Sequence, residues 1–421
     1  MRLPDSTSFF RNLAMRDRSS PGAFAGDLPS GWIEVRIGEA LEHFAERVEL
    51  LGDVVYDLIS IRRRHGGMFH RERLPGRAIL TKSVQRVVPG SFVIARRQIV
   101  HGACAIAAPE FDGNVMSMSY SAFHGTPICD ARYFFALAQQ PHMIRYFWES
   151  SHGVVIEKLN FQQEEWLGFP VRLPPLEEQR RIQEILDTTD RTIKATERVI
   201  AKLCDAHEGL RQELLPHHPA QDVVEAHLGD LIDPSRPIVY GILMPGDHVH
   251  GGVPVIKVKD IRDGAIADRQ TLLHTSPQVD QQYARSRVRE GDVLFTIRGT
   301  VGRTAVVPQS LDGANITQDT ARLAIADVNR SYLLAAMAAD RFNGFVEVHT
   351  VGQAVKGINL RELRKAPVLL LERDQQEVVG AALDDSLARV DAEKGQLRKL
   401  RLLRSGLAAD LLSGRVRTVA A

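Results

Sequence analysis

The sequence predicts a mixed α/β protein in which two similar globular domains are separated by two long antiparallel helices that form a coiled coil. Three observations predict this fold. Residues 174–215 carry apolar side chains at helical spacing over an unusual length, and the same pattern returns near the end of the chain. Each of these stretches follows a segment in which short strand patterns and helix patterns are mixed. Together they predict an internal repeat with a pseudo-two-fold relation between the halves.

The first long helix is predicted from its seam and from its ends. Pro174 and Pro175 end any helix that arrives from upstream, and Pro216 closes the other end. Glu177 and Glu178 follow the prolines, where acidic groups oppose the positive end of the helix dipole. A row of apolar or small residues, which we call the seam, recurs at spacings of three and four residues, apart from one spacing of seven that skips His207. This pattern is typical of a helix that lies along another helix. Its members are Ile182, Leu186, Thr189, Ile193, Thr196, Ile200, Leu203, Leu210 and Leu214.

The second long helix repeats the first with a shift of 197 positions, which takes Ile182 to Val379. The polar interruptions repeat in register, as do Gln179 with Gln376 and Gly209 with Gly406. Two unrelated amphipathic helices would not share these interruptions, so we favour a true repeat. The side chains predicted to form the interface of the helix pair are Ile182, Leu186, Ile193, Ile200, Leu203, Leu210, Val379, Leu383, Val390, Leu397, Leu400 and Leu407.

The composition indicates a soluble globular protein of two or more domains. The chain has 421 residues, of which 44% are hydrophobic and 25% charged, and its formal net charge is +1. This charge neither announces nor excludes a nucleic-acid binder, because local patches matter more than the sum. The three cysteines fit no zinc spacing and are typical of reduced thiols in a cytoplasmic protein. The sequence shows neither a secretory signal nor an apolar run long enough for a membrane span.

The two halves open with similar phrases, IEVRIGEAL from Ile33 and VEAHLGDLI from Val224, each predicted to be a strand followed by a turn. In the first half, 87–100 and 113–123 are predicted strands, and 131–150 is predicted to be one helix. In the second half, 253–261 is a predicted strand, 291–307 a pair of strands around a glycine-rich turn, and 331–342 a helix. The predicted boundaries are an extension at 1–28, a first domain at 29–173, a first long helix at 174–216, a second domain at 217–370, a second long helix at 371–416 and a tail at 417–421.

Motifs for catalysis and cofactor binding are missing from the sequence. It contains neither a phosphate-binding Gly-x-x-x-x-Gly-Lys loop, nor a Gly-x-Ser-x-Gly elbow, nor the tetrapeptide of amino-methyltransferases. His248 and His250 resemble half a metal site, but a solvated loop explains them better. We therefore predict no catalytic residue, metal or cofactor. The turn from Arg298 to Arg303 has two glycines between two arginines; it is either a plain hairpin turn or a loop whose amides approach phosphate.

Several phrases resemble the conserved regions of type I restriction–modification specificity subunits. They are the PPLEEQ start at Pro174, the LLSGRV ending at Leu411, VPVIKVKDI from Val253, GDVL from Gly291 and GANITQ from Gly313. The resemblance runs from Gly31 to Val416. Two departures are the LERDQQ start of the second helix at Leu371 and the Arg96-Arg97-Gln98 sequence near the place of Arg298-Gly299-Thr300.

The resemblance implies a non-catalytic subunit for sequence-specific DNA binding in phage defence. Each α/β domain would be a target recognition domain that reads one half of a bipartite site in double-stranded DNA. The long helices would set the spacing and dock two methyltransferase subunits, through which restriction and translocase subunits join. A helix of about 33 residues is roughly 50 Å long, which corresponds to about 15 base pairs of duplex.

Direct DNA contacts are predicted for polar residues in loops of the two domains, because arginine and glutamine can contact bases in pairs of hydrogen bonds and lysine neutralises phosphate. A solvated surface charge is an equally plausible reading for any single one. The candidates in the first domain are Arg62, Arg63, Arg64, Arg71, Arg73 and Lys82, and those in the second are Lys257, Lys259, Arg262, Arg298, Arg303, Gln318 and Lys356.

Two other functions fit parts of the sequence. A coiled-coil scaffold whose globular heads bind protein partners is favoured slightly by the near-zero net charge, and it predicts DNA affinity that does not change with salt. A self-contained methyltransferase or nuclease is disfavoured by the missing catalytic motifs.

Overall fold

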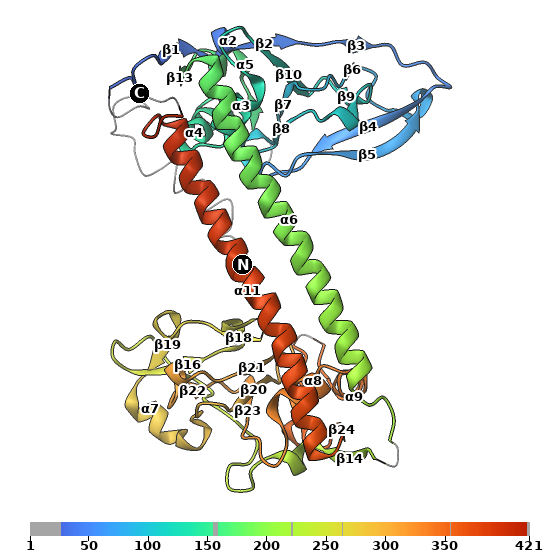
Figure 1. Cartoon of the computed structure of the whole chain (residues 1–421), viewed down its shortest axis with the longest axis vertical. Helices are drawn as coiled ribbons and strands as arrows, with labels where there is room; N and C mark the ends of the chain where they lie inside the picture. Colours follow the sequence, from blue (N-terminus) through green and yellow to red (C-terminus); the bar gives the residue numbers. More distant parts are fainter. Residues whose placement is uncertain (1–26, 155–158, 220–221, 263, 354, 419–421) are drawn as a thin grey trace. The chain divides into compact units, whose positions relative to one another are not determined.

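The computed structural model describes residues 27–154, 159–219, 222–262, 264–353 and 355–418. The predicted N-terminal extension therefore lies almost entirely outside the described residues. Two compact units divide the chain: residues 1–195 with 397–421 form the first, and residues 196–396 form the second. Each unit contains one α/β domain and a part of each long helix, α6 (Leu176–Leu214) and α11 (Arg373–Leu412). Figure 1 labels the elements of both units and colours them by position in the sequence, from blue at the N-terminus to red at the C-terminus.

The α/β domain of the first unit is built around a four-stranded antiparallel sheet in the order β2-β10-β7-β8. A five-stranded sheet, β3-β6-β9-β4-β5, lies beside it, and β1 pairs antiparallel with β13. The elements are β1 (Ile33–Arg36), α2 (Ile37–Ala40), β2 (Leu41–Phe44), β3 (Arg47–Val48), β4 (Val55–Ile61), β5 (Met68–Pro75), β6 (Val84–Arg86), β7 (Phe92–Ala95), β8 (Cys104–Ile106), β9 (Val115–Ser117), β10 (Tyr120–Gly125), α3 (Ala131–Ala138), α4 (Pro141–Glu149), β11 (Ser151–His152), β12 (Asn160–Phe161), α5 (Gln163–Leu167) and β13 (Pro170–Leu173).

The second unit repeats this topology with a four-stranded sheet in the order β15-β23-β20-β21 and an antiparallel pair, β14 with β24. Its accessory sheet is smaller, with the order β19-β16-β22, and β17 pairs with β18. The elements are β14 (Val224–His227), β15 (Val239–Tyr240), β16 (Val253–Ile256), β17 (Ile261–Arg262), β18 (Ala265–Ile266), β19 (Leu273–Thr275), α7 (Pro277–Gln282), β20 (Val293–Thr296), β21 (Thr304–Val306), β22 (Asn315–Ile316), β23 (Thr320–Leu323), α8 (Arg330–Met337), α9 (Asp340–Val348), α10 (Leu360–Leu363) and β24 (Pro367–Leu370).

The internal repeat extends to single hydrogen bonds. Gln179, at the start of α6, is buried and its side chain accepts the N–H of Asp130, the residue that caps α3. Gln376, at the start of α11, is also buried and accepts the N–H of Asn329, the residue that caps α8. The same amide side chain therefore fastens each long helix to the cap of the corresponding short helix in its own unit.

Four of the secondary-structure predictions need correction. The predicted helix at 131–150 is two helices, because Pro141 starts α4 and cannot continue the hydrogen bonding of α3. The predicted helix at 331–342 is likewise divided into α8 and α9, although no proline stands there. The end of the predicted strand at 87–100 is a 3-10 turn, Ile99–His101, whose β-branched side chains are buried. Similarly, 253–261 is a strand only to Ile256 and then turns.

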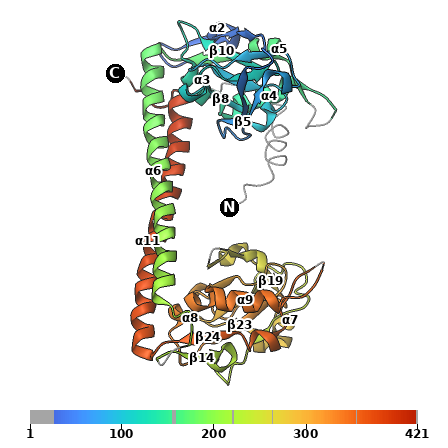
Figure 2. The same ribbon diagram turned by 90° about the vertical axis from the view of Figure 1, so that its right-hand side faces the viewer.

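Within each unit the two long helices run antiparallel and close the domain core. In the first unit, Ile182 and Leu186 of α6 belong to the same buried cluster as Ala408 and Leu411 of α11. In the second unit, Leu210 and Leu214 of α6 pack against the cluster that contains Val379 and Leu383 of α11. Figures 1 and 2 both show the paired helix segments side by side in each unit. The helix pair is therefore continuous with the domain cores.

All twelve side chains predicted for the helix interface are at least half-buried. Ile182, Leu186, Val379, Leu383, Val390 and Leu397 are buried, and the remaining six are half-buried. By contrast Ile185, Val199, Val378, Leu387, Leu402 and Leu403, which lie off the seam, are exposed. Among the described residues, none of the helices is long and apolar enough to cross a membrane.

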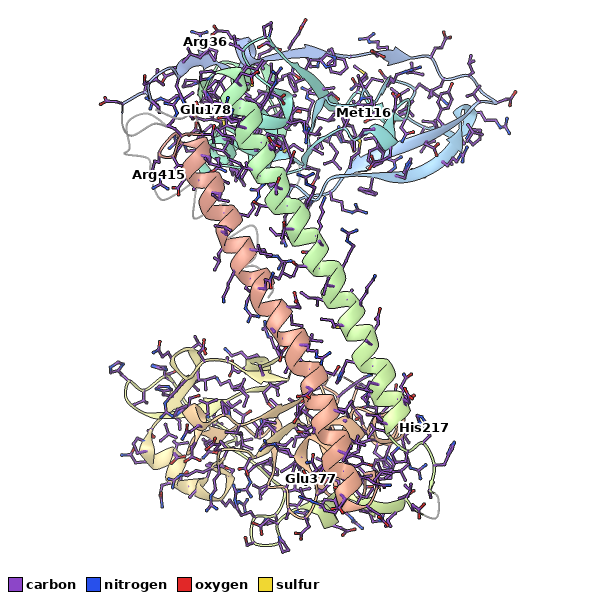
Figure 3. All side chains as sticks on the ribbon, in the orientation of Figure 1. Arg36, Met116, Glu178, His217, Glu377 and Arg415 are labelled. Atoms are coloured by element: carbon purple, nitrogen blue, oxygen red, sulfur yellow. The ribbon has the colours of Figure 1, made fainter. Side chains whose placement is uncertain are left out.

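An ion pair that the sequence did not reveal fastens the C-terminal segment to α6. Glu178 is fully buried, and both of its carboxylate oxygens accept hydrogen bonds of 2.8 Å from Arg417, which also donates to the carbonyl of Ser30. Figure 3 shows Glu178 at the first turn of α6, close to the end of α11. Burial opposes ionisation of Glu178, but the hydrogen bonds from Arg417 and Thr418 outweigh it and lower its pKa.

Replacing Glu178 with glutamine should destabilise the first unit by about 1–3 kcal/mol at neutral pH, because it removes charge-assisted hydrogen bonds. The folded-state pKa is below the ordinary value of 4.5, so this stabilisation is present above that pH and is lost as the pH falls through the folded pKa. Hydrogen exchange of the first turns of α6 in the two chains, compared between about pH 7 and about pH 3, measures this. A difference that persists undiminished at the acidic end would contradict the assignment.

Candidate nucleic-acid interface

The predicted DNA-contacting residues of the second unit gather on one set of loops that are bound together through their backbones. Gln318 donates its N–H to Ile242, and Arg298 donates to Asp319, with N···O distances of 3.0 and 3.3 Å. The amide of Gly299 donates to Lys356 at 2.8 Å. We call these loops, residues 240–244, 298–303, 317–319, 351–353 and 355–357, the second-unit loop cluster. The cluster contains Arg298, Gln318 and Lys356, which are far apart in the sequence but lie on loops that share backbone hydrogen bonds.

The glycine-rich turn connects this cluster to a second group of cations. Thr296 organises the turn, since its hydroxyl donates to the carbonyl of Thr300 and accepts the N–H of Arg303. The guanidinium of Arg303 donates to the carbonyl of Ile261 at 3.0 Å, and Arg262 donates to the carbonyl of Lys259 at 3.1 Å. These cations bond to neutral carbonyls, so their positive charge is not cancelled.

Two further observations complete the second-unit site. Lys257 is half-buried and directly follows Ile256, whose carbonyl accepts the N–H of Thr317 at 3.2 Å, so it stands next to the loop cluster. The one carboxylate paired with a predicted contact residue of this unit is that of Asp319, 4.0 Å from Arg298 in the described part of the chain. The hydrogen bonds thus link the loops of Arg298, Arg303, Gln318 and Lys356, with Lys257, Lys259 and Arg262 adjoining them. Of the six cations, Lys257 and Arg303 are half-buried and the other four are exposed.

The candidates of the first unit lie in three places: the turn of the β4–β5 hairpin, the strand β5, and the segment that follows the hairpin. Arg62, Arg63 and Arg64 lie in the turn that joins the strands, next to the pair Ile61 and Met68. Arg71 and Arg73 lie further along β5, and Lys82 lies beyond the other end of the hairpin, where it donates to the carbonyl of Gly76. Arg71 pairs with Glu72, and Arg73 lies 3.6 Å from Asp57, its partner across the strands. These carboxylates offset the charge of Arg71 and Arg73. The arginines of the turn have no such carboxylate partner among the described residues.

A residue absent from the predicted contacts, Arg97, occupies the place in the first unit that Arg298 has in the second. Ala95 pairs with Tyr120 at the end of β7, as Thr296 pairs with Thr320 at the end of β20. Arg97 and Arg298 each follow these residues by two positions and are exposed. The repeat could have revealed Arg97, had the two sheets been aligned strand by strand.

Within the described residues, no group of three or more histidine, cysteine, aspartate or glutamate side chains is placed to hold a metal ion. His248 stacks on His274 with ring centroids 5.1 Å apart, and its Nδ1 accepts the N–H of His274, so these rings serve the local loop structure. Burial raises the pKa of the Cys104 thiol well above its usual range, which keeps it protonated.

Each of the two units combines an α/β domain with segments of two long helices that run antiparallel within the unit, and the predicted contact residues lie on loops and strands of these domains. Residues 80–204 match the family model for the type I restriction modification DNA specificity domain. The specificity subunit of the type I restriction enzyme EcoBI of Escherichia coli is 27% identical over 252 residues, which is 53% of this chain and 53% of that protein. The alignment thus spans about half the length of this curated relative.

Two solved structures share the fold. One, from work on complex assembly and conformational transition of the type I R-M system, has a TM-score of 0.55 and 21% identity, and the match covers 93% of this chain and all of that one. The other, the type I restriction–modification S subunit from M. genitalium, has a TM-score of 0.55 and 13% identity over 92% of this chain and 97% of its own. The family match lies within residues 80–204, and the two solved structures share the fold of this chain.

Proposed function

We propose that this chain recognises a bipartite site in double-stranded DNA and performs no catalysis itself. The observation that carries the proposal is the second-unit loop cluster, which holds Arg298, Arg303, Lys356 and Gln318, together with Lys257, Lys259 and Arg262 beside it. Among these residues, in the described part of the chain, the one ion pair is that of Arg298 with Asp319. Backbone hydrogen bonds fix the loops before any ligand arrives, and fixed loops lose little conformational entropy on binding. The turn at Arg62 to Arg64, with Arg97, would form the corresponding surface of the first unit.

Recognition would combine phosphate and base contacts. Lysine side chains and exposed arginines neutralise phosphate, whereas Gln318 and Arg298 offer the paired hydrogen-bonding groups that read base edges. The two surfaces occupy the same position on equivalent sheets, as the shared strand order indicates. Each unit would therefore read one half-site, in a system whose activity is supplied by other chains.

The long helices would set the separation of the half-sites and dock the methyltransferase subunits. The 39 residues of α6 correspond to roughly 58 Å at 1.5 Å per residue. Apolar side chains remain exposed on these helices, among them Leu402 and Leu403 in the first unit and Val378 and Leu387 in the second. Such side chains suit docking of two modification subunits, through which restriction subunits would join, in the cytoplasm.

A salt titration of duplex-DNA binding tests the proposal. We expect the logarithm of the affinity to fall linearly with the logarithm of the salt concentration, with a slope of about −0.9 for each neutralised phosphate. Replacing Arg298 and Lys356 together with glutamine should reduce the slope by about two such contacts. Arg341→Gln is the matched control, because Arg341 lies on α9 and pairs with Glu225.

A slope near zero for the unmodified chain, with or without modification subunits, would refute the proposal. If the slope is steep instead, sequencing the methylation pattern of DNA modified by the assembled complex would identify both half-sites and their spacing.

A further inference from the structure

The turn that carries Arg62, Arg63 and Arg64 contains the one pair of successive non-glycine residues with positive φ in the described backbone. Arg64 and His65 have φ values of 58° and 54°, and only one other described residue apart from glycine, Asp327, has a positive φ. This left-handed conformation brings the β-carbon close to the backbone, so that residues other than glycine adopt it in only a few per cent of cases; asparagine, aspartate and histidine do so more often than arginine. Two such residues in succession require that the surroundings hold them in place.

His65 provides that hold through its backbone and its ring. Its N–H donates to the carbonyl of Gly102 at 2.8 Å, and the preceding N–H, of Arg64, donates to the carbonyl of His101 at 2.8 Å. The imidazole is half-buried: its Nδ1 lies 3.5 Å from the sulfur of Cys104, and its edge faces the ring of Phe135. Burial, with a smaller contribution from the positive charge of Arg404, lowers the pKa of His65 to about 4, so the ring is neutral at physiological pH.

Two of the neighbouring guanidinium groups have a defined contact, and within the described residues none of the three arginines forms an ion pair. Arg62 lies over the ring of Phe69 with its central carbon 4.3 Å from the centroid. Arg63 donates from Nε to the side-chain oxygen of Gln98 at 2.7 Å. In the described part of the chain the ion pairs of this hairpin involve Arg71, Arg73 and Arg77, not the arginines of the turn. Three like charges are thus concentrated on a strained backbone.

This arrangement is unfavourable for folding, both sterically and electrostatically, so an anionic ligand that gains from it is the simplest reason for its presence. We infer that residues 62–65 form a preorganised clamp for the phosphates of duplex DNA and that His65 is its positioning residue. The inference rests on the proposed function. His65 itself contributes no charge; it fixes the left-handed backbone from which Arg62, Arg63 and Arg64 project.

The experiment uses the complete chain and a duplex of mixed sequence at several salt concentrations. His65→Gly removes the ring and permits the left-handed backbone without strain, yet it leaves every cation in place. We expect it to lower the affinity and to reduce the magnitude of the salt slope by about one to two contacts of 0.9 each. Arg64→Gly should raise the melting temperature by relieving strain and at the same time reduce the slope by about one contact.

Two further variants complete the comparison. Arg132→Gln, which removes a cation that lies on α3 and is already paired with Asp187, is the control and should leave the slope unchanged. His65→Asn adopts the left-handed conformation but lacks the ring, so it should behave like His65→Gly if that variant folds poorly. Hydrogen exchange of the β4–β5 hairpin reports whether the fold is retained.

The outcomes separate the two proposals. If the unmodified chain binds duplex DNA with a steep salt slope and the His65 and Arg64 variants match it, the clamp is wrong and the proposed function stands. If the unmodified chain shows no salt-dependent binding, the proposed function fails first. A rise in melting temperature for Arg64→Gly without loss of affinity would mean that the strain does not serve DNA binding, and it would overturn the clamp.

Discussion

Replacing Leu186 with aspartate is expected to unfold the first unit. Leu186 is 1% exposed and belongs to the cluster that joins α6 to α11 and to the domain core. A carboxylate without a partner in such a place costs several kcal/mol, either as buried charge or as the work of protonating it. That cost approaches the whole stability of a typical domain, which is about 5–15 kcal/mol.

Hydrogen exchange across the complete chain measures this effect unit by unit. The matched control is Ile185→Asp, which introduces the same side chain one position earlier, where the native residue is 36% exposed. We expect that change to alter stability by no more than about 0.5 kcal/mol. Equal protection in the Leu186 variant and the unmodified chain would mean that the helix pair does not complete the core of the first unit.

Replacing Gly241 with alanine is expected to separate two loops of the second-unit loop cluster. A β-carbon at this position would lie 1.9 Å from the carbonyl oxygen of Ile316, which is backbone and cannot rotate away. Ile242 donates to that same carbonyl at 2.8 Å, so the crossing of the two loops depends on the glycine. The loops must move apart, at a cost of about 1–3 kcal/mol.

The functional result should be a loss of affinity at one half-site, because Gln318 and Arg298 would lose the support of the loop at Ile242. The control is Gly344→Ala in α9, where a β-carbon meets nothing within 4 Å. That variant should be neutral or stabilised by up to about 1 kcal/mol. Footprinting of both half-sites in each variant distinguishes the results; symmetrical loss of both would contradict the role assigned to this crossing.

The helices and the repeat could be predicted because their signals are local and periodic. The seam residues recur at the helical period, and Gln179 and Gln376 stand in the same place relative to it. The division of the short helices was only partly readable: Pro141 signals a break, whereas nothing in the sequence at Ala338 and Ala339 does. Ile99 and Val100 favour strands by propensity, but burial in a turn decided their structure.

The candidate interface was harder to predict because the charge of a surface depends on partners that are distant in sequence. Asp57 lies opposite Arg73 only through the register of β4 with β5, and Glu178 meets Arg417 across most of the chain. From the sequence, Arg71 and Arg298 are equal candidates. In the structure, Arg71 lies 2.5 Å from the carboxylate of Glu72, whereas Arg298 lies 4.0 Å from that of Asp319. The backbone strain at Arg64 has no sequence signature, since arginine gives no sign of a left-handed conformation.

The order in which the chain is synthesised gives the two units different folding histories. The second unit is one uninterrupted segment, residues 196–396, so all of its core has left the ribosome once that segment has emerged. The first unit needs Ala408, Leu411 and Leu412, which are made more than 200 residues after Leu186. Its sheets must therefore wait, with apolar surface uncovered, until the whole second unit and the last turns of α11 have been made, a period in which chaperones would be most needed.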